Sequence, residues 1–138
     1  MTNIDWSEYY KGTDGNPPHP LLIKALAYVQ NRGKAIDLGA GALNETRYLL
    51  EQGFDVTTVD QSPLVEQEAR HIGSGKLHAF TTSFENFDFP KEEYDLAVAI
   101  YALPFMENHF NYVFVKIKLS LKNGGVFCCD FFGNRDVS

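Results

Sequence analysis

The chain has 138 residues, 44% hydrophobic and 22% charged, a composition typical of one soluble globular domain spanning residues 1–138. Its net charge of −6 argues against a nucleic-acid backbone or an anionic membrane as partner, since both are bound through surplus Lys and Arg. The start, MTNIDWSEYY, lacks the pattern of a secretory signal, and no apolar run approaches the roughly 20 residues of a membrane span, so we expect a cytoplasmic location.

Segments with strand-like and helix-like patterns alternate along the chain. Short apolar or β-branched runs indicate buried strands, and apolar residues three or four positions apart indicate helices. This alternation predicts an α/β fold, with a parallel sheet covered by helices on both faces. In chain order, the patterns predict a helix at 21–33, a strand at 34–38, a helix at 44–52, a strand at 55–59, a helix from Ser62, strands at 76–81 and 94–100, a helix at 108–122 and a strand at 125–132.

Capping residues set the expected helix boundaries. The side chains of Asn44 and Ser62 can accept hydrogen bonds at a helix N-terminus, and Pro63 suits the first helical position. Glycine suits the position after a helix end. We therefore expect the helices that precede the first, second and last of these strands to end at Gly33, Gly53 and Gly124–Gly125, respectively.

The turn after the first predicted strand has the features of a ligand site. Ligands of open parallel sheets bind beyond the carboxyl ends of the strands. Gly39 and Gly41 remove two Cβ atoms there, so a ligand can lie against the backbone. Asp60 ends the next strand about 20 residues later, where a carboxylate can accept hydrogen bonds from both ribose hydroxyls. These features favour a nucleoside-containing ligand; the alternative is a tight turn with Asp60 as a helix cap.

Asp37 indicates which nucleoside-containing ligand fits. A carboxylate inside the strand, just before the first glycine, attracts a cation and repels a pyrophosphate. Dinucleotide sites also carry a third glycine where this chain has Asn44. S-adenosylmethionine has a ribose, a sulfonium and an ammonium group but no phosphate, so it suits Asp37 and Asp60 better than a nicotinamide dinucleotide does.

At these motifs the chain resembles the class I S-adenosylmethionine-dependent methyltransferases, which have a Rossmann-like parallel sheet. AIDLGAG looks like the family's first motif, VTTVDQSP the next, SFENFDFPKEEYDLAVAIYALPFM its loop and fourth strand, and LSLKNGGVFCCDFF its turn and fifth strand. The opening WSEYY with NPPHPLL resembles the lid helices of small members such as the tellurite-resistance methyltransferases. The resemblance implies that the cofactor is bound by Asp37, Gly39, Ala40 and Gly41 in the first motif, by Asp60 at the ribose, by Gln61, Ser83 and Phe84 at the adenine, and by Tyr101 near the methionine part.

The chain departs from this family at three points. Leu43 stands where the family has a third glycine, and Ser83 where it usually has an acidic residue at the adenine amino group, so we expect a weaker affinity or a reshaped loop. The family's strand order is 3-2-1-4-5-7-6, and this chain stops after strand five, which leaves one edge of that strand open. We expect a homodimer to cover this edge; the alternatives are the tail FGNRDVS or another polypeptide.

Methyl transfer needs an acceptor held close to the methyl group and water excluded, so a dedicated base is not required. Tyr10 and His19 fall in segments suited to lining a pocket for a small-molecule acceptor, with His19 as the candidate base. The alternative is that both are structural, with Tyr10 a packing aromatic. His71 and His78 have no Cys or carboxylate at a ligand-like spacing, so no metal is expected.

Two functions remain open from the sequence. The first is an S-adenosylmethionine-dependent methyltransferase that acts on a small molecule, with neither nucleic acid nor a membrane as partner. The second is a non-catalytic protein that binds S-adenosylmethionine and has lost its acceptor residues. A nicotinamide dehydrogenase is opposed by Asp37 and by a chain too short for a second nucleotide-binding half.

Overall fold

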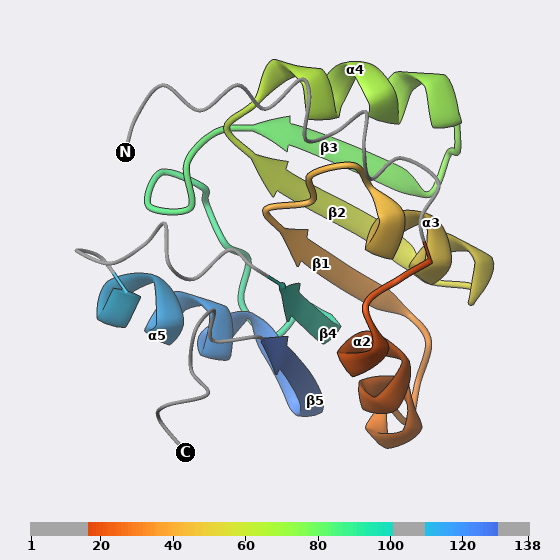
Figure 1. The fold of residues 1–138 in the computed structure, drawn as a ribbon. Helices are drawn as coiled ribbons and strands as arrows, with labels where there is room; N and C mark the ends of the chain where they lie inside the picture. The colour runs from red at the N-terminus through yellow and green to blue at the C-terminus, as the bar shows by residue number, and fades with distance from the viewer. Residues whose placement is uncertain (1–16, 101–109, 130–138) are drawn as a thin grey trace, which may run out of the picture.

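The computed structural model describes residues 17–100 and 110–129, which form a single sheet with helices on both faces (Figure 1). The five strands are all parallel and lie in the order β3-β2-β1-β4-β5, which confirms the predicted α/β class and the expected order of the first five strands. The elements are α2 (Pro20–Ala25), the 3₁₀ helix η1 (Leu26–Tyr28), β1 (Lys34–Leu38), α3 (Asn44–Glu51), β2 (Asp55–Asp60), α4 (Pro63–Ile72), β3 (Leu77–Thr81), β4 (Tyr94–Ala99), α5 (Phe110–Ser120) and β5 (Leu121–Cys129).

The central strands β1 and β4 are buried on both faces. All residues of β4, and those of β1 from Ala35 to Leu38, are buried, as expected for a parallel strand covered by helices on both sides. In Figure 1, α3 and α4 lie along β1 to β3, and α5 lies beside β4 and β5. Helical residues that pack on the sheet include Leu22, Leu26 and Leu49 from α2, η1 and α3 on one face, and Val113 and Ile117 from α5 on the other. From α4, Val65 and Ala69 pack beside β3.

Local capping signals place α4 and the end of α3 as predicted. The Ser62 hydroxyl accepts a hydrogen bond from the N–H of Leu64 at 3.2 Å, and Pro63 is the first helical residue of α4. Gly53 follows α3 with a φ of 99°, a conformation that glycine adopts readily. The expected cap at Asn44 is wrong, because Asn44 is the first residue of α3 and the residue before it occupies the cap position.

The predicted helix over 21–33 is too long, since η1 ends at Tyr28 and Val29 is already extended. Gly33 does not end a helix but lies where the buried side chain of Asp95 approaches the backbone. A Cβ at position 33 would lie 2.5 Å from Asp95 Oδ2, which accepts a hydrogen bond from the N–H of Lys34 at 3.0 Å. A Cβ at position 33 would have to push this carboxylate aside, so the close tertiary contact favours glycine here.

The predicted end of the last helix, at Lys122 before the glycines, is also wrong. α5 ends at Ser120, and its last turn is tied to the loop before β4. The carbonyl oxygens of Leu119 and Ser120 accept hydrogen bonds from the N–H groups of Glu92 and Glu93 at 3.0 and 2.8 Å. These bonds satisfy carbonyl groups that a helix end leaves open, so the chain leaves the helix there.

β5 begins earlier than the predicted strand at 125–132. Leu121 already pairs with Tyr94, and the register then shifts before the regular pairing resumes. Gly124, with a φ of 86°, and Gly125 lie within this irregularity rather than at a helix end. Residues 108–109 and 130–132 of the two predictions lie outside the described part of the chain.

We expect Gly33→Ala to lower the free energy of unfolding by about 1–3 kcal/mol, because the new methyl group displaces the Asp95 carboxylate from its hydrogen bond. Gly75→Ala is the matched control, since nothing lies within 4 Å of a Cβ built there, and it should stay within about 0.5 kcal/mol of the wild type. Urea unfolding of the two variants measures both values. Equal stabilities would contradict the close contact at Gly33.

Candidate cofactor site

The glycine turn lies at the carboxyl ends of β1 and β2, as expected. Gly39 and Gly41 have φ values of 72° and 56°, in the left-handed region that residues with a Cβ rarely adopt. The N–H of Gly39 donates to the carbonyl oxygen of Val59 at 2.8 Å, and Ala40 between the glycines is buried. The turn is therefore held against the end of β2, with the backbone bare at both glycines.

Leu43 keeps the left-handed conformation of a glycine position, with a φ of 68° and a ψ of 21°. This conformation costs a residue with a Cβ roughly 1–2 kcal/mol. The side chain is fully buried beside Ala40, Val65 and Ala69, which is worth roughly 1.5–3 kcal/mol for a leucine. Burial thus offsets the strain, and Leu43 continues the left-handed backbone of the two glycines.

The carboxylate of Asp60 is fixed on both oxygens at the end of β2. Oδ1 accepts from the N–H of Ser62 at 2.9 Å, and Oδ2 accepts from the N–H of Gly41 at 3.3 Å. Burial raises the pKa of Asp60, and these two N–H groups oppose that rise. Asp60 therefore joins the glycine turn to the start of α4, and its remaining lone pairs can accept further hydrogen bonds.

Asp37 is a buried carboxylate on the face of β1 that α3 covers. The Thr46 hydroxyl donates to its Oδ2 at 2.6 Å. Burial raises the pKa of Asp37 to about 7; the nearby charges of Glu45 and Asp60 also raise it, and the bond from Thr46 lowers it. Negative charge is thus concentrated at the glycine turn, and a cationic group bound there would lower the free-energy cost of keeping these buried carboxylates ionised.

Glu45 and Thr46, in the first turn of α3, are functional candidates that the sequence reasoning missed. Glu45 Oε2 accepts a hydrogen bond from the backbone N–H of His19 at 2.9 Å. The ring of His19 is engaged elsewhere, because Nδ1 accepts from the N–H of Leu21 at 3.0 Å and caps α2. The available signal was two polar residues in the helical turn that directly follows the glycines.

The other predicted cofactor residues lie near the same edge or outside the described residues. Gln61 is exposed directly after Asp60, and Ser83 follows β3. Phe84 packs on the core cluster beneath α5. Tyr101, and Tyr10 predicted to line the acceptor pocket, lie outside the described residues. Along the carboxyl ends of the strands lie the predicted cofactor residues Asp37, Gly39, Ala40, Gly41, Asp60, Gln61 and Ser83.

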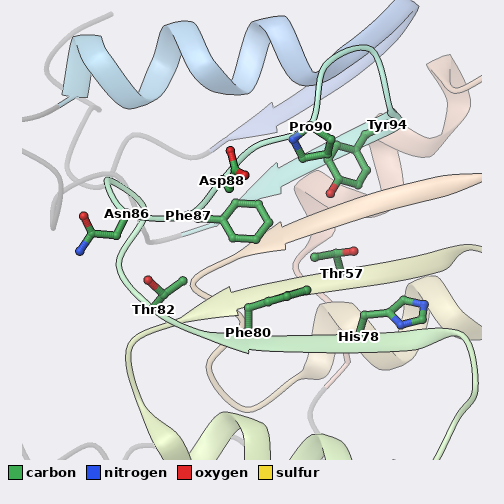
Figure 2. A pocket seen from close by; sticks show the side chains of 9 residues that line it. All are labelled: Thr57, His78, Phe80, Thr82, Asn86, Phe87, Asp88, Pro90 and Tyr94. Carbon is green, nitrogen blue, oxygen red and sulfur yellow. The ribbon is translucent and has the colours of Figure 1, made fainter.

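A cavity of about 590 Å³ lies away from the glycine turn, on the sheet face that carries α5. Residues 82–93, all of which the structure describes, form no helix that could cover this face of β3. Phe80 on β3 is accordingly 48% exposed. Figure 2 shows the rings of Phe80 and Phe87 close together there, in an edge-on arrangement with centroids 5.4 Å apart. The cavity is lined by Thr57, His78, Phe80, Thr82, Asn86, Phe87, Asp88, Pro90 and Tyr94, none of which was predicted to bind the cofactor.

A family model described as a methyltransferase domain matches residues 36–129, which include the last three residues of β1, the glycine turn and the whole of β2 to β5. The chain belongs to the class I S-adenosylmethionine-dependent methyltransferases. Membership in this family decides against the nicotinamide dehydrogenase considered above. None of the curated protein sequences matches the methyltransferase chain significantly.

Solved structures of methyltransferases share this fold. A Haloferax volcanii methyltransferase in complex with the Trm112 methyltransferase activator is 22% identical, with a TM-score of 0.75; the match covers 94% of this chain and 61% of the Haloferax chain. The Burkholderia thailandensis 1,6-didemethyltoxoflavin-N1-methyltransferase, with bound 1,6-didemethyltoxoflavin and S-adenosylhomocysteine, is 24% identical (TM-score 0.71; 88% and 56% covered). An S-adenosylmethionine-dependent methyltransferase from Mesorhizobium loti is 25% identical (TM-score 0.66; 76% and 50% covered). The present chain thus spans 50–61% of the length of these three solved methyltransferases.

Among residues 17–100 and 110–129, no group of three or more His, Cys, Asp or Glu side chains is placed to hold a metal ion. Within the same ranges, no helix combines the length and the apolar character needed to cross a membrane.

We expect Asp37→Asn to remove a pH dependence of stability. Because folding raises the pKa of Asp37 from 3.8 to about 7, the folded state favours the protonated form. The stabilisation that comes from holding the Asp37 carboxyl in its protonated form is therefore complete below about pH 4 and is lost as the pH rises to about 7. The variant should be more stable than the wild type at pH 8 and equally stable at pH 4, as measured by urea unfolding. Exposed Asp88→Asn is the control, and a wild-type slope retained in Asp37→Asn would contradict the assignment.

Proposed function

We propose that the chain binds S-adenosylmethionine at the carboxyl ends of β1, β2 and β3 and transfers its methyl group to a small-molecule acceptor. The observation that carries this proposal is the double anchoring of the Asp60 carboxylate by Gly41 and Ser62. A carboxylate already held by two backbone N–H groups loses little freedom when it accepts hydrogen bonds from a ribose, so the site is preorganised.

The residues present fit the chemistry of this cofactor. Gly39, Ala40 and Gly41 offer a backbone against which the ligand can lie, and the two glycines hold conformations that a side chain would oppose. The raised pKa values of Asp37 and Asp60 reflect negative charge that burial leaves poorly solvated. The ammonium and sulfonium of S-adenosylmethionine supply the compensating positive charge, whereas a pyrophosphate would add to the repulsion.

The adenine and methionine contacts follow the family pattern. We assign Gln61, Ser83 and Phe84 to the adenine, and Tyr101 to the methionine part. Ser83 is held in a turn, because its hydroxyl accepts from the N–H of Asn86 at 3.1 Å. S-adenosylmethionine, once bound, supplies a methyl group activated by the sulfonium, so the protein's task is to hold the acceptor in line and exclude water.

A small-molecule acceptor is favoured by the net charge of −6, which suits neither a nucleic-acid backbone nor an anionic membrane. The Burkholderia thailandensis enzyme, which was solved with bound 1,6-didemethyltoxoflavin, is consistent with a small acceptor on this fold. Tyr10 and His19 remain the proposed acceptor-lining residues. Since His19 Nδ1 accepts a backbone hydrogen bond, the neutral ring carries its proton on Nε2 and would act there as a donor rather than a base. The cytoplasmic location stays a prediction.

The alternative function is a non-catalytic protein that binds S-adenosylmethionine. It is favoured by His19, the candidate base, because its Nδ1 already accepts a hydrogen bond from the N–H of Leu21. Release of S-adenosylhomocysteine, measured against a panel of small acceptors that includes thiols and a tellurium nucleophile, separates the two functions. Turnover with any acceptor supports the enzyme, and binding without turnover across the panel favours the alternative.

We expect Asp60→Ala to weaken S-adenosylhomocysteine binding by about 10–100-fold, as the loss of a hydrogen bond to a charged group costs roughly 1.5–3 kcal/mol. Asp55→Ala is the matched control, because it removes a carboxylate from the opposite end of the same strand. Isothermal titration calorimetry measures the two dissociation constants. An unchanged constant for Asp60→Ala would refute the ribose assignment.

We also propose a homodimer formed through β5 or the helix beside it. β5 is an edge strand of the described sheet, and α5 exposes Tyr112, Val115 and Leu119 by 54–55% along one side. Light scattering at micromolar concentration should give twice the 15.6 kDa mass of the chain. Val115→Lys should lower that mass if the interface includes α5, and a monodisperse monomer in the wild type would refute the dimer.

A further inference from the structure

His19 connects the segment before α2 to the glycine turn. Its backbone N–H donates to Glu45 Oε2 at 2.9 Å, across 26 positions of sequence. Its ring Nδ1 accepts from the N–H of Leu21 and so caps α2. The residue is therefore held by α3 through its backbone and by α2 through its ring, which brings the segment Pro17–Pro20 to the start of α3.

Glu45 occupies the position on α3 at which such a connection has most effect. It lies in the first turn of the helix, where the helix dipole stabilises a negative charge. Its neighbour Thr46 donates to the buried carboxylate of Asp37 at 2.6 Å. One helical turn thus contacts the central strand through Thr46 and the N-terminal segment through Glu45, directly after Gly39 and Gly41.

We propose that Glu45 is a positioning residue for the cofactor, which fixes the segment Pro17–Pro20 as one wall of the site beside the glycine turn. This inference rests on the proposed function, because the wall matters only if the cofactor binds at that turn. A wall already in place adds contacts to the ligand without an ordering cost at the moment of binding. Loss of the bond from His19 to Glu45 makes the ligand bear that cost, and the affinity falls.

A second way for Glu45 to act is through its charge alone. Its carboxylate lies close enough to Asp37 to influence that group, and it would also attract the cationic part of the cofactor. The two roles differ in what a glutamine would do. A glutamine side chain keeps an oxygen that can accept the hydrogen bond from His19 but carries no charge, so Glu45→Gln preserves a positioning role and removes an electrostatic one.

The first comparison uses Glu45→Ala, Glu45→Gln and Glu51→Ala, the last of which removes an exposed carboxylate from the other end of α3. We expect Glu45→Ala to weaken S-adenosylhomocysteine binding by about tenfold in calorimetry. We expect Glu45→Gln to stay within about threefold of the wild type and Glu51→Ala to be unchanged. Amide hydrogen exchange at His19, read by NMR without ligand, should be about tenfold faster in Glu45→Ala alone.

The second comparison removes the donor and leaves Glu45 intact. His19 has a φ of −60° and a ψ of 138°, which proline adopts without strain, so His19→Pro deletes the N–H. His19→Ala deletes the ring cap and keeps the N–H. We expect His19→Pro to bind S-adenosylhomocysteine about tenfold more weakly than His19→Ala does. This pair also keeps the inference testable if Glu45→Ala fails to fold.

Wild-type affinity in Glu45→Ala, or equal affinity in the two His19 variants, would overturn the positioning role. So would a loss in Glu45→Gln as large as that in Glu45→Ala, because charge would then be responsible. If the wild type itself does not bind S-adenosylhomocysteine, the proposed function fails and this inference falls with it. If the wild type binds S-adenosylhomocysteine and every Glu45 and His19 variant binds it equally well, the inference alone fails and the proposed function stands.

Discussion

The carboxylate of Asp37, buried within the central strand, is the constraint on which the carboxyl edge depends. Its hydrogen bond comes from Thr46, so the first turn of α3 has to lie directly over β1. Only a short turn connects the two elements, and it reaches this position through left-handed residues at Gly39, Gly41 and Leu43. The bare backbone at the proposed ligand position is thus also the backbone that allows α3 to satisfy Asp37.

The same edge gathers more negative charge than its own hydrogen bonds compensate. Asp60 is held by two backbone N–H groups, Asp37 by one hydroxyl, and Glu45 adds a third carboxylate at the N-terminus of α3. In the isolated protein a proton is the available compensation, which is why burial and neighbouring charge raise the pKa of Asp37 to about 7. A ligand with a positive charge replaces that proton, so affinity for the cofactor and protonation of the site are linked.

Features encoded by neighbouring residues could be predicted from the sequence. The buried run at β1, the cap at Ser62 with Pro63, and the placement of Asp37, the glycines and Asp60 at strand ends all depend on short stretches of chain. Two of the errors arose where a distant residue decides the local structure: Asp95 lies against Gly33, and the N–H groups of Glu92 and Glu93 bond the end of α5. Glu45 was missed for the same reason, because its partner His19 is distant in sequence and donates through its backbone, which no side-chain pattern reveals.

The connection between β3 and β4 joins the proposed adenine contact at Ser83 to an aromatic cluster on the sheet face that carries α5. The carbonyl oxygen of Ser83 accepts a hydrogen bond from the N–H of Phe87 at 3.0 Å. Phe87 packs edge-on against Phe80 (Figure 2) and against Phe89, and these contacts help to position the turn that holds Ser83. Substitutions in this aromatic trio would shift Ser83 without touching a ligand. Residues that never touch the ligand would thus set its affinity by placing Ser83, while every contact residue stays the same.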